Sequence, residues 1–272
     1  MTERILLSID AGVAEVRLNR PDKMNAIDPA MFEALVDTGT RLMHEPDLRA
    51  VVLSGEGRAF CAGLDMASMA SLGNGTGADM AGGRLAKRTH GLANLPQYAC
   101  TVWRDLPVPV LAAVHGVAYG GGLQIALGAD VRYVRADTRL SIMEIKWGLV
   151  PDMGGMALAR GLVRPDQLRA LIYSGRVVNG EEACALGLAT QVVDDPRAAA
   201  LAAAREIAQK SPDAIRAAKR LMRVTEDGDT ATILLAESVE QDRLIGGANQ
   251  REAVIAAMEN RAPVFQPDAT DN

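Results

Sequence analysis

Residues 110–127 have the sequence VLAAVHGVAYGGGLQIAL. The first five are uncharged and apolar, which predicts a fully buried strand, and residues 123–127 predict a buried helix. Three glycines separate the two elements, so the backbone can approach a ligand closely while the helix start presents free N–H groups to negative charge. These are the requirements of an oxyanion hole, although a tight packing turn is an alternative. The glycines lack the spacing of a dinucleotide fingerprint or a phosphate loop.

The residues before this stretch alternate between predicted strands and helices. Residues 5–9 and 13–18 predict two strands around a turn at 10–12, and residues 50–53 predict a short buried strand. Asp28-Pro29 supplies a helix N-cap and a proline at the first helical position. The pattern predicts an α/β core.

Two regions differ from this core. Residues 66–83 are rich in glycine and methionine, which favours a flap or a surface insertion over a packed element, and a helical stretch with Arg84, Lys87 and Arg88 is expected next. From about residue 195 the chain is predicted to be helical, with starts at Asp195-Pro196 and Ser211-Pro212 and further helices over 229–245 and 250–260. We therefore expect a core over 1–195 and a helical region over 196–272.

Composition excludes several classes of function. The 272 residues carry a net charge of −5 and only 3% aromatic side chains, so a nucleic-acid-binding surface is not expected. Residues 106–129 lack charge, but Pro107, Pro109 and the glycines argue against a membrane span. Three cysteines do not make a disulfide framework, and residues 1–7 do not resemble a signal peptide, so we expect a soluble protein of the cytoplasm.

The reactive side chains outside these motifs are few. His44, His90 and His115 have no partners at metal-ligand spacing, so no metal is expected. No Gly-x-Ser-x-Gly elbow nominates a serine nucleophile. Cys61, in the loop Phe60-Cys61-Ala62-Gly63-Leu64-Asp65, is predicted to be a buried free thiol, while the small residues around Gly63 present a backbone amide.

Together, the motifs resemble the crotonase (enoyl-CoA hydratase/isomerase) superfamily over about residues 5–266. The stretches that carry the resemblance are Asn19–Ala26, Phe60–Asp65, His115–Gly122, Gly148–Gly155 and Asn260–Phe265. The resemblance implies an α/β fold with a ββα spiral core, and a helical C-terminal region that assembles a homo-trimer or a dimer of trimers.

The resemblance also implies an acyl-CoA site, with coenzyme A as part of the substrate and no separate cofactor. By motif position, the backbone N–H groups of Leu64 and Gly121 would bind the thioester oxygen. The residues expected near CoA are Lys23, Asn25, Ala26, Ala62, Asp65, Met66 and Phe265. Phe265 would close over the nucleotide, in some relatives from a neighbouring subunit. Arg84, Lys87 and Arg88 could contact CoA phosphates or form a solvated face.

The reaction is less well defined. Hydratases of the superfamily typically use two glutamates, and this chain has Glu144 but carries Gln124 at the other position. A glutamine can hold water but cannot exchange a proton at neutral pH. Asp152, together with Glu144, resembles the acidic pair of the dienoyl-CoA isomerase branch, although that branch has an aspartate at the Gln124 position. Asp152 could instead be a turn residue or cap the helix near Gly154.

The sequence therefore supports three hypotheses. The first is hydration or double-bond isomerisation of an enoyl-CoA, with Glu144 as general acid/base, Asp152 as its partner and Gln124 as a positioner. The second is an inactive acyl-CoA-binding protein, suggested by the missing glutamate, and the third is an acyl-CoA hydrolase of the same fold. An RNA-binding role, known in the superfamily, is disfavoured by the acidic charge balance.

Overall fold

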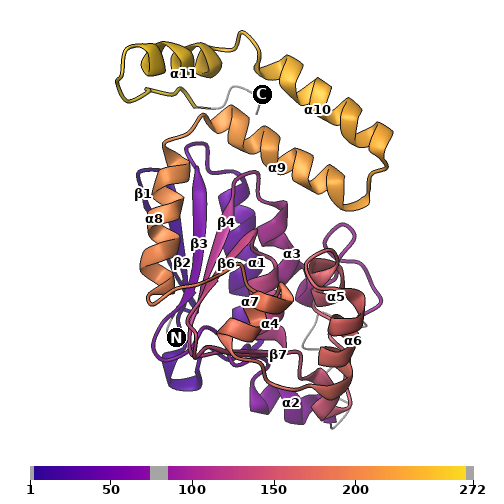
Figure 1. Ribbon diagram of the computed structural model, residues 1–272. Helices are drawn as coiled ribbons and strands as arrows, with labels where there is room; N and C mark the ends of the chain where they lie inside the picture. Colours follow the sequence, from indigo (N-terminus) through magenta and orange to yellow (C-terminus); the bar gives the residue numbers. More distant parts are fainter. Residues whose placement is uncertain (1–2, 74–84, 268–272) are drawn as a thin grey trace.

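The computed structural model describes residues 3–73 and 85–267 (Figure 1). It confirms the α/β class. A six-stranded sheet has the order β1-β2-β3-β4-β6-β8, and its only antiparallel pair in the described chain is β1 with β2. Its strands are β1 (Ile5–Asp10), β2 (Val13–Leu18), β3 (Ala50–Gly55), β4 (Val110–Val114), β6 (Val131–Val134) and β8 (Gln191–Val192). Two further strands, β5 (Val117–Tyr119) and β7 (Arg139–Ser141), form a separate parallel pair.

Successive units contribute one strand to each sheet. β4 is followed by β5 and then by α4 (Gly121–Leu127), and β6 is followed by β7 and then by helices. Because β4 pairs with β6 while β5 pairs with β7, each unit lies beside the next in both sheets. The arrangement is the expected repetition of strand, strand and helix. It places the starts of α4 and of the segment after β7 close together.

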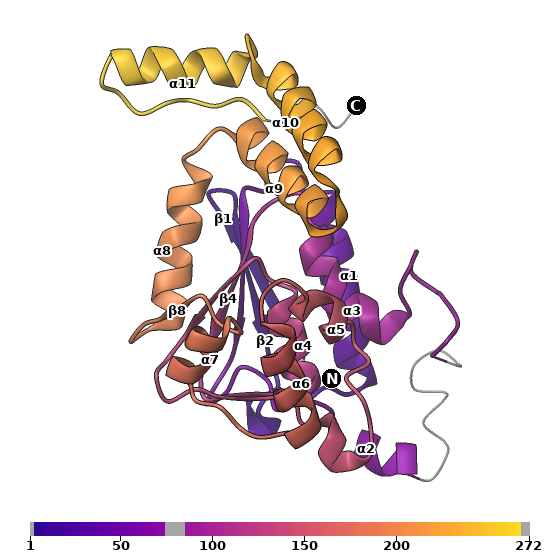
Figure 2. The ribbon, with the colours of Figure 1, turned by 45° about the vertical axis from the view of Figure 1, so that its right-hand side comes forward.

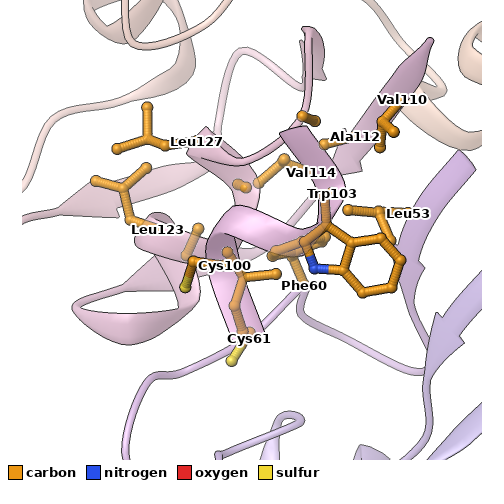
Figure 3. Packing of buried hydrophobic residues seen from close by; sticks show 14 of the residues in the cluster. Leu53, Phe60, Cys61, Cys100, Trp103, Val110, Ala112, Val114, Leu123 and Leu127 are labelled. Carbon is orange, nitrogen blue, oxygen red and sulfur yellow. The ribbon is translucent and has the colours of Figure 1, made fainter. Parts of the chain in front are cut away.

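The larger sheet is covered by helices on both faces. Side chains alternate between the two faces along each strand, so apolar side chains on both faces need to be buried. One face packs against α8 (Pro196–Ala208), and the other against α1 (Pro29–Met43), α3 (Leu95–Asp105) and α4 (Figure 2). The α8 side consists of Val13, Ala50, Val52, Leu111, Ala113, Ala200 and Ala204. Figure 3 shows the other side, where Trp103 lies near Phe60 and Leu53.

The predicted helix starts are confirmed in atomic detail. Asp28 accepts a hydrogen bond from the N–H of Met31, and Asp195 and Ser211 cap α8 and α9 (Pro212–Asp227) in the same way. In each case a proline occupies the first turn, where its missing N–H costs nothing.

The expectations for residues 66–88 need correction. Residues 66–73 form a helix, α2, with Ser68 buried, instead of an irregular segment. Residues 74–84, including Arg84, lie outside the described residues. No helix follows directly, because 85–93 form turns and the next helix, α3, begins at Leu95. The Arg88 guanidinium donates to the carbonyls of Leu85 and Leu92, which satisfies loop acceptors that a helix would have used internally.

Short elements connect the units between β1 and α8. They are η1 (Pro21–Lys23), η3 (Glu144–Trp147), α5 (Gly155–Ala159), α6 (Pro165–Ser174) and α7 (Gly180–Leu186). The sequence patterns did not identify α6 and α7, whose apolar faces are short.

The C-terminal helices α9, α10 (Thr230–Leu244) and α11 (Ala248–Met258) lie beyond one end of the larger sheet, while α8 lies along it (Figures 1 and 2). The predicted helical content after residue 195 is confirmed. Lys219 joins α9 to the core, since its buried ammonium donates to the Val108 carbonyl at 2.7 Å and to Asp130 at 2.9 Å. Among the helices described, none is long and apolar enough to cross a bilayer.

Candidate active site

A glycine allows the loop after β3 to lie against the start of α4. Cys61 forms a parallel bridge with Ala118, and Gly63 follows with a φ of +88°. A Cβ added to Gly63 would lie 2.6 Å from the Tyr119 carbonyl oxygen and 3.7 Å from the Gly121 nitrogen. Only glycine therefore allows the backbone that leads into Leu64 to approach Gly121.

The backbone N–H groups of Leu64 and Gly121 have no acceptor in the described chain, whereas their neighbours do. Asp65 N–H donates to the Ile27 carbonyl, and Gly120 N–H donates to the Ser141 carbonyl. Gly121 begins α4, so its N–H also has no partner in the helix. The structure thus brings together two unused donors, and their role as an oxyanion hole stays a prediction.

Glu144 and Gln124 meet beside these amides. Gln124 comes from α4 and Glu144 from the first residue of η3, and both side chains are buried. The Gln124 Nε2 donates to Glu144 Oε1 at 2.7 Å. A Cβ on Gly120 would lie 3.3 Å from Glu144 Oε1, so the carboxyl group lies directly against the start of α4.

Burial controls the electrostatics of the carboxyl groups. Desolvation raises the pKa of Glu144, the negative charge of Asp152 raises it further, and the hydrogen bond from Gln124 opposes the rise. Desolvation also raises the pKa of Asp152, although this residue is solvent-accessible. Both carboxyl groups therefore keep their protons to a higher pH than an ordinary carboxyl group, as in sites where carboxyl groups exchange protons.

The two alternatives for Asp152 can now be separated in part. The N-cap of α5 is Gly154, and no side chain caps that helix. The capping interpretation is therefore wrong, while the turn-residue interpretation stays open; the negative charge of Asp152 contributes to the raised pKa of Glu144.

Most of the predicted CoA-binding residues lie in two loops that are joined by backbone hydrogen bonds. Ala62 N–H donates to the Met24 carbonyl, and Ile27 N–H donates to the Gly63 carbonyl. These bonds bring together Lys23, Asn25, Ala26, Ala62, Asp65 and Met66. Of these, Lys23 and Met66 are exposed at the surface.

The side chains of Asn25 and Asp65 form hydrogen bonds with other residues of the protein. The fully buried Asn25 amide donates to the carbonyls of Glu56, Ala59 and Phe60, and its oxygen accepts from Arg20 N–H. The Asn25 side chain therefore holds the loop, and its hydrogen-bonding groups are used by the protein. That Asn25 lies near bound CoA stays a prediction.

Arg20 is a residue that the sequence motifs contained but that we did not identify as important. Its guanidinium donates to Asp65 at 2.6 Å and to the Ala26 carbonyl at 3.0 Å, so it connects the two loops. The pKa of Asp65 is lowered: although burial raises it, hydrogen bonds from the Ala67 N–H and from Arg20 outweigh that effect.

Phe265 lies apart from the other CoA-binding candidates within one chain. It lines a cavity of about 730 Å³ next to Gly12, Arg49 and Lys210. Gly12 precedes β2, whereas the CoA-binding loops follow β2 and β3, so Phe265 is at the opposite end of the parallel strands. A contact between Phe265 and the same nucleotide would require a second copy of the chain.

The remaining reactive side chains each contact another group of the protein. Cys61 is buried with its thiol donating to the Asn25 carbonyl, and burial raises its pKa to about 12, which confirms the predicted inert thiol. His115 contacts the Gly57 carbonyl at 3.0 Å, and His90 stacks on Tyr98. In the described part of the chain, no three His, Cys, Asp or Glu side chains are grouped so that they could hold a metal ion.

The fold and site define an α/β protein in which unused backbone amides lie near a buried carboxyl group, and comparison with known proteins identifies the family and the fold. The model of the enoyl-CoA hydratase/isomerase family matches residues 8–268. The chain is 36% identical to the mitochondrial Delta(3,5)-Delta(2,4)-dienoyl-CoA isomerase of Mus musculus over 212 residues, which are 76% of this chain and 64% of that protein. It thus spans just under two thirds of that relative's length.

Two further similarities cover more of both chains. A Mycobacterium tuberculosis protein named "Probable enoyl-CoA hydratase EchA14" is 37% identical over 221 residues, 81% of this chain and 82% of that protein. The solved structure of an enoyl-CoA hydratase from Bacillus anthracis superposes with a TM-score of 0.88 at 27% identity, over 97% of this chain and 100% of that one. The chain belongs to the enoyl-CoA hydratase/isomerase family and has the crotonase fold.

Proposed function

We propose that this chain binds an acyl-CoA thioester and catalyses hydration or double-bond isomerisation of an enoyl-CoA in fatty-acid or related metabolism. The observation that carries the proposal is the position of Glu144, a buried carboxyl group with a raised pKa beside the unused N–H groups of Leu64 and Gly121. Coenzyme A enters as part of the substrate, and no further cofactor or metal is required.

In this proposal the two amides bind the thioester oxygen. As negative charge develops on that oxygen, each preorganised donor contributes about 3–4 kcal/mol in a site that excludes water. Glu144 takes a proton from a substrate carbon while the electron pair of the C–H bond moves toward the thioester oxygen, and it then returns the proton to another carbon. Asp152 is the second carboxyl group, and its raised pKa suits it to donate or accept a proton at the accessible side.

CoA itself would be held by the loops around Lys23, Ala26, Ala62, Asp65 and Met66. Lys23 supplies an exposed positive charge for a phosphate, and the backbone of Ala26 and Ala62 is placed by the hydrogen bonds described above. Asn25 contributes by holding this backbone. Phe265 would contact the nucleotide of a neighbouring copy.

We also propose that the chain works as a homo-trimer or a dimer of trimers in the cytoplasm. The support is the large apolar side chains that α10 and α11 leave exposed, including Leu234, Leu235, Val254 and Met258. Light scattering after size-exclusion chromatography measures the mass that tests this assembly.

The test of the reaction incubates the protein with crotonyl-CoA, 3-enoyl-CoA and 3,5-dienoyl-CoA, and follows products by mass spectrometry and ultraviolet absorbance. Added water identifies a hydratase, and an absorbance change at constant mass identifies an isomerase. Release of free CoA identifies the hydrolase alternative, and binding without turnover favours the inactive alternative or a thioester outside this panel.

Glu144→Gln should abolish turnover, while the matched control Glu181→Gln, an exposed glutamate on α7, should keep it. A Glu144→Gln protein with wild-type turnover would show that the assignment of the general acid/base is wrong.

A further inference from the structure

Gln124 is held in one orientation by the loop that precedes α5. Its Oε1 accepts hydrogen bonds from the backbone N–H groups of Met153 and Gly155, each at 2.9 Å. A flipped amide would place its NH₂ group against these two donors, so the oxygen must face the loop. Gly155 makes this contact possible, since a Cβ there would lie 2.6 Å from Gln124 Oε1.

The fixed oxygen determines where the other end of the amide points. Nε2 faces Glu144 and donates to Oε1 at 2.7 Å. Glu144 Oε2 is buried and has no hydrogen-bond partner in the described part of the chain. The two oxygens of this carboxyl group are therefore not equivalent, because Oε1 accepts a hydrogen bond from Gln124 and Oε2 accepts none from the described part of the chain.

We infer that Gln124 is a positioning residue that ties the loop at 153–155 to Glu144 Oε1 and leaves Oε2 as the oxygen that exchanges protons with the substrate. This inference rests on the proposed function for the identity of the substrate, an acyl-CoA thioester, but not for the contacts themselves. The protein already uses the Gln124 acceptor and one of its two N–H bonds, so the expectation that Gln124 positions water or substrate now depends on the second N–H bond.

A glutamate in place of Gln124 would change the site in a defined way. One carboxylate oxygen could still accept from Met153 and Gly155, but the other would face Glu144 Oε1 across the present 2.7 Å contact. Two ionised carboxylates at that distance repel, so the pair would share a proton and titrate in two steps.

The charges around Glu144 come from the elements that pack against it. Asp152, on the loop before α5, raises the pKa of Glu144. Cys100, on α3, interacts electrostatically with Glu144. On its own element, Lys146 lies over the Trp147 ring, and α6 packs against η3. Changes at position 124 therefore act on a carboxyl group whose other charged neighbours stay in place.

The first measurement is a ¹³C NMR titration of the Glu144 side-chain carboxyl carbon, assigned by loss of its signal in Glu144→Gln. We expect one titration step in the wild type. Gln124→Glu should give two steps, the upper about one pH unit or more above the wild-type value. Gln124→Met, which removes the donor without adding charge, should give one step at raised pH. The exposed Gln191→Glu serves as the control and should leave the Glu144 titration unchanged.

The second measurement is the pH dependence of kcat/KM on the thioester that the wild type turns over. Because Glu144 must be ionised to accept a proton, the acid limb should move to higher pH in both Gln124 variants and follow the NMR value. Below both pKa values, kcat/KM should fall about tenfold for each pH unit of that movement.

The outcomes separate this inference from the proposed function. If the wild type turns over no thioester, the proposed function fails while the NMR titration still decides the role of Gln124. If Gln124→Met and Gln124→Glu lower the melting temperature but leave the Glu144 titration at its wild-type position, the residue is merely structural and the inference is wrong. Gln124→Glu keeps the acceptor for the 153–155 loop, so it serves as the test if Gln124→Met does not fold.

Discussion

Replacement of Gly63 by alanine perturbs the amide pair without removing any functional side chain. The added Cβ would lie 2.6 Å from the Tyr119 carbonyl oxygen, where ordinary contact begins at 3.4 Å. One of the two backbones must therefore move by about 0.8 Å, the difference between these distances. That movement separates Leu64 N–H from Gly121 N–H, because Gly63 precedes Leu64 and Tyr119 lies two residues before Gly121.

Two costs follow, and they act on different quantities. A left-handed φ in a residue other than glycine costs about 1–2 kcal/mol of the free energy of unfolding. A misplaced oxyanion donor costs about 2.7–4 kcal/mol of transition-state stabilisation, or roughly a 100- to 1,000-fold loss of kcat. Gly63→Ala should show both effects.

Gly161 provides a matched control. Its φ is +81°, close to the +88° of Gly63, but in the described chain no atom lies within 4 Å of an added Cβ. Gly161→Ala should lose stability from the strained φ and keep kcat within about twofold of the wild type.

The assay compares kcat and the thermal midpoint for both variants, using the thioester that the wild type turns over. Gly63→Ala should be at least 100-fold slower than Gly161→Ala after circular dichroism has shown that both are folded. If the two folded variants have equal kcat, the Leu64 and Gly121 amides do not form the oxyanion hole.

Four further results are expected. Because burial raises the pKa of Glu144, its ionised form destabilises the fold, so Glu144→Gln should be more stable than the wild type at neutral pH. That gain, about 1.4 kcal/mol per unit of pKa difference, should disappear in urea titrations as pH falls below the ordinary carboxyl range. Asn25→Ala should lose about 2–4 kcal/mol of unfolding free energy because three carbonyls lose their donor, whereas Lys23→Ala should keep the thermal midpoint and raise KM several-fold. Asp130→Asn should cost about 2–3 kcal/mol in chemical denaturation, since it leaves the buried Lys219 ammonium without its charged partner.

The elements that the sequence predicted correctly are those with strong local signals. The strand over 110–114 is uniformly apolar, and the helix starts at Asp28-Pro29, Asp195-Pro196 and Ser211-Pro212 each carry a cap and a proline. Such signals depend on neighbouring residues alone, so they survive without knowledge of tertiary contacts.

The failures occur where particular side-chain hydrogen bonds or backbone angles determine the local structure. Residues 85–93 contain helix-forming side chains, yet Arg88 stabilises turns by donating to carbonyls in the loop and to Gln97 on α3. The Asp152 capping interpretation failed because Gly154, with a φ of +89°, is the N-cap of α5 and no side chain caps that helix. Neither the acceptors of Arg88 nor the backbone conformation at Gly154 can be inferred from residue spacing.

The site itself was only partly accessible to sequence analysis, because many of its important atoms belong to the backbone. Leu64 and Gly121 enter the proposed oxyanion hole through their backbone N–H groups alone, and what marks these positions in the sequence is the glycine at or next to each. Gln124 shows a similar limit of sequence analysis for a side chain. Its identity raised doubt about hydration, but only the N–H groups of Met153 and Gly155 reveal which way its amide must point. Once that orientation is fixed, the hydrogen bond to Glu144 follows, and a residue that looks like the loss of a catalytic acid becomes the group that sets the geometry of the remaining one.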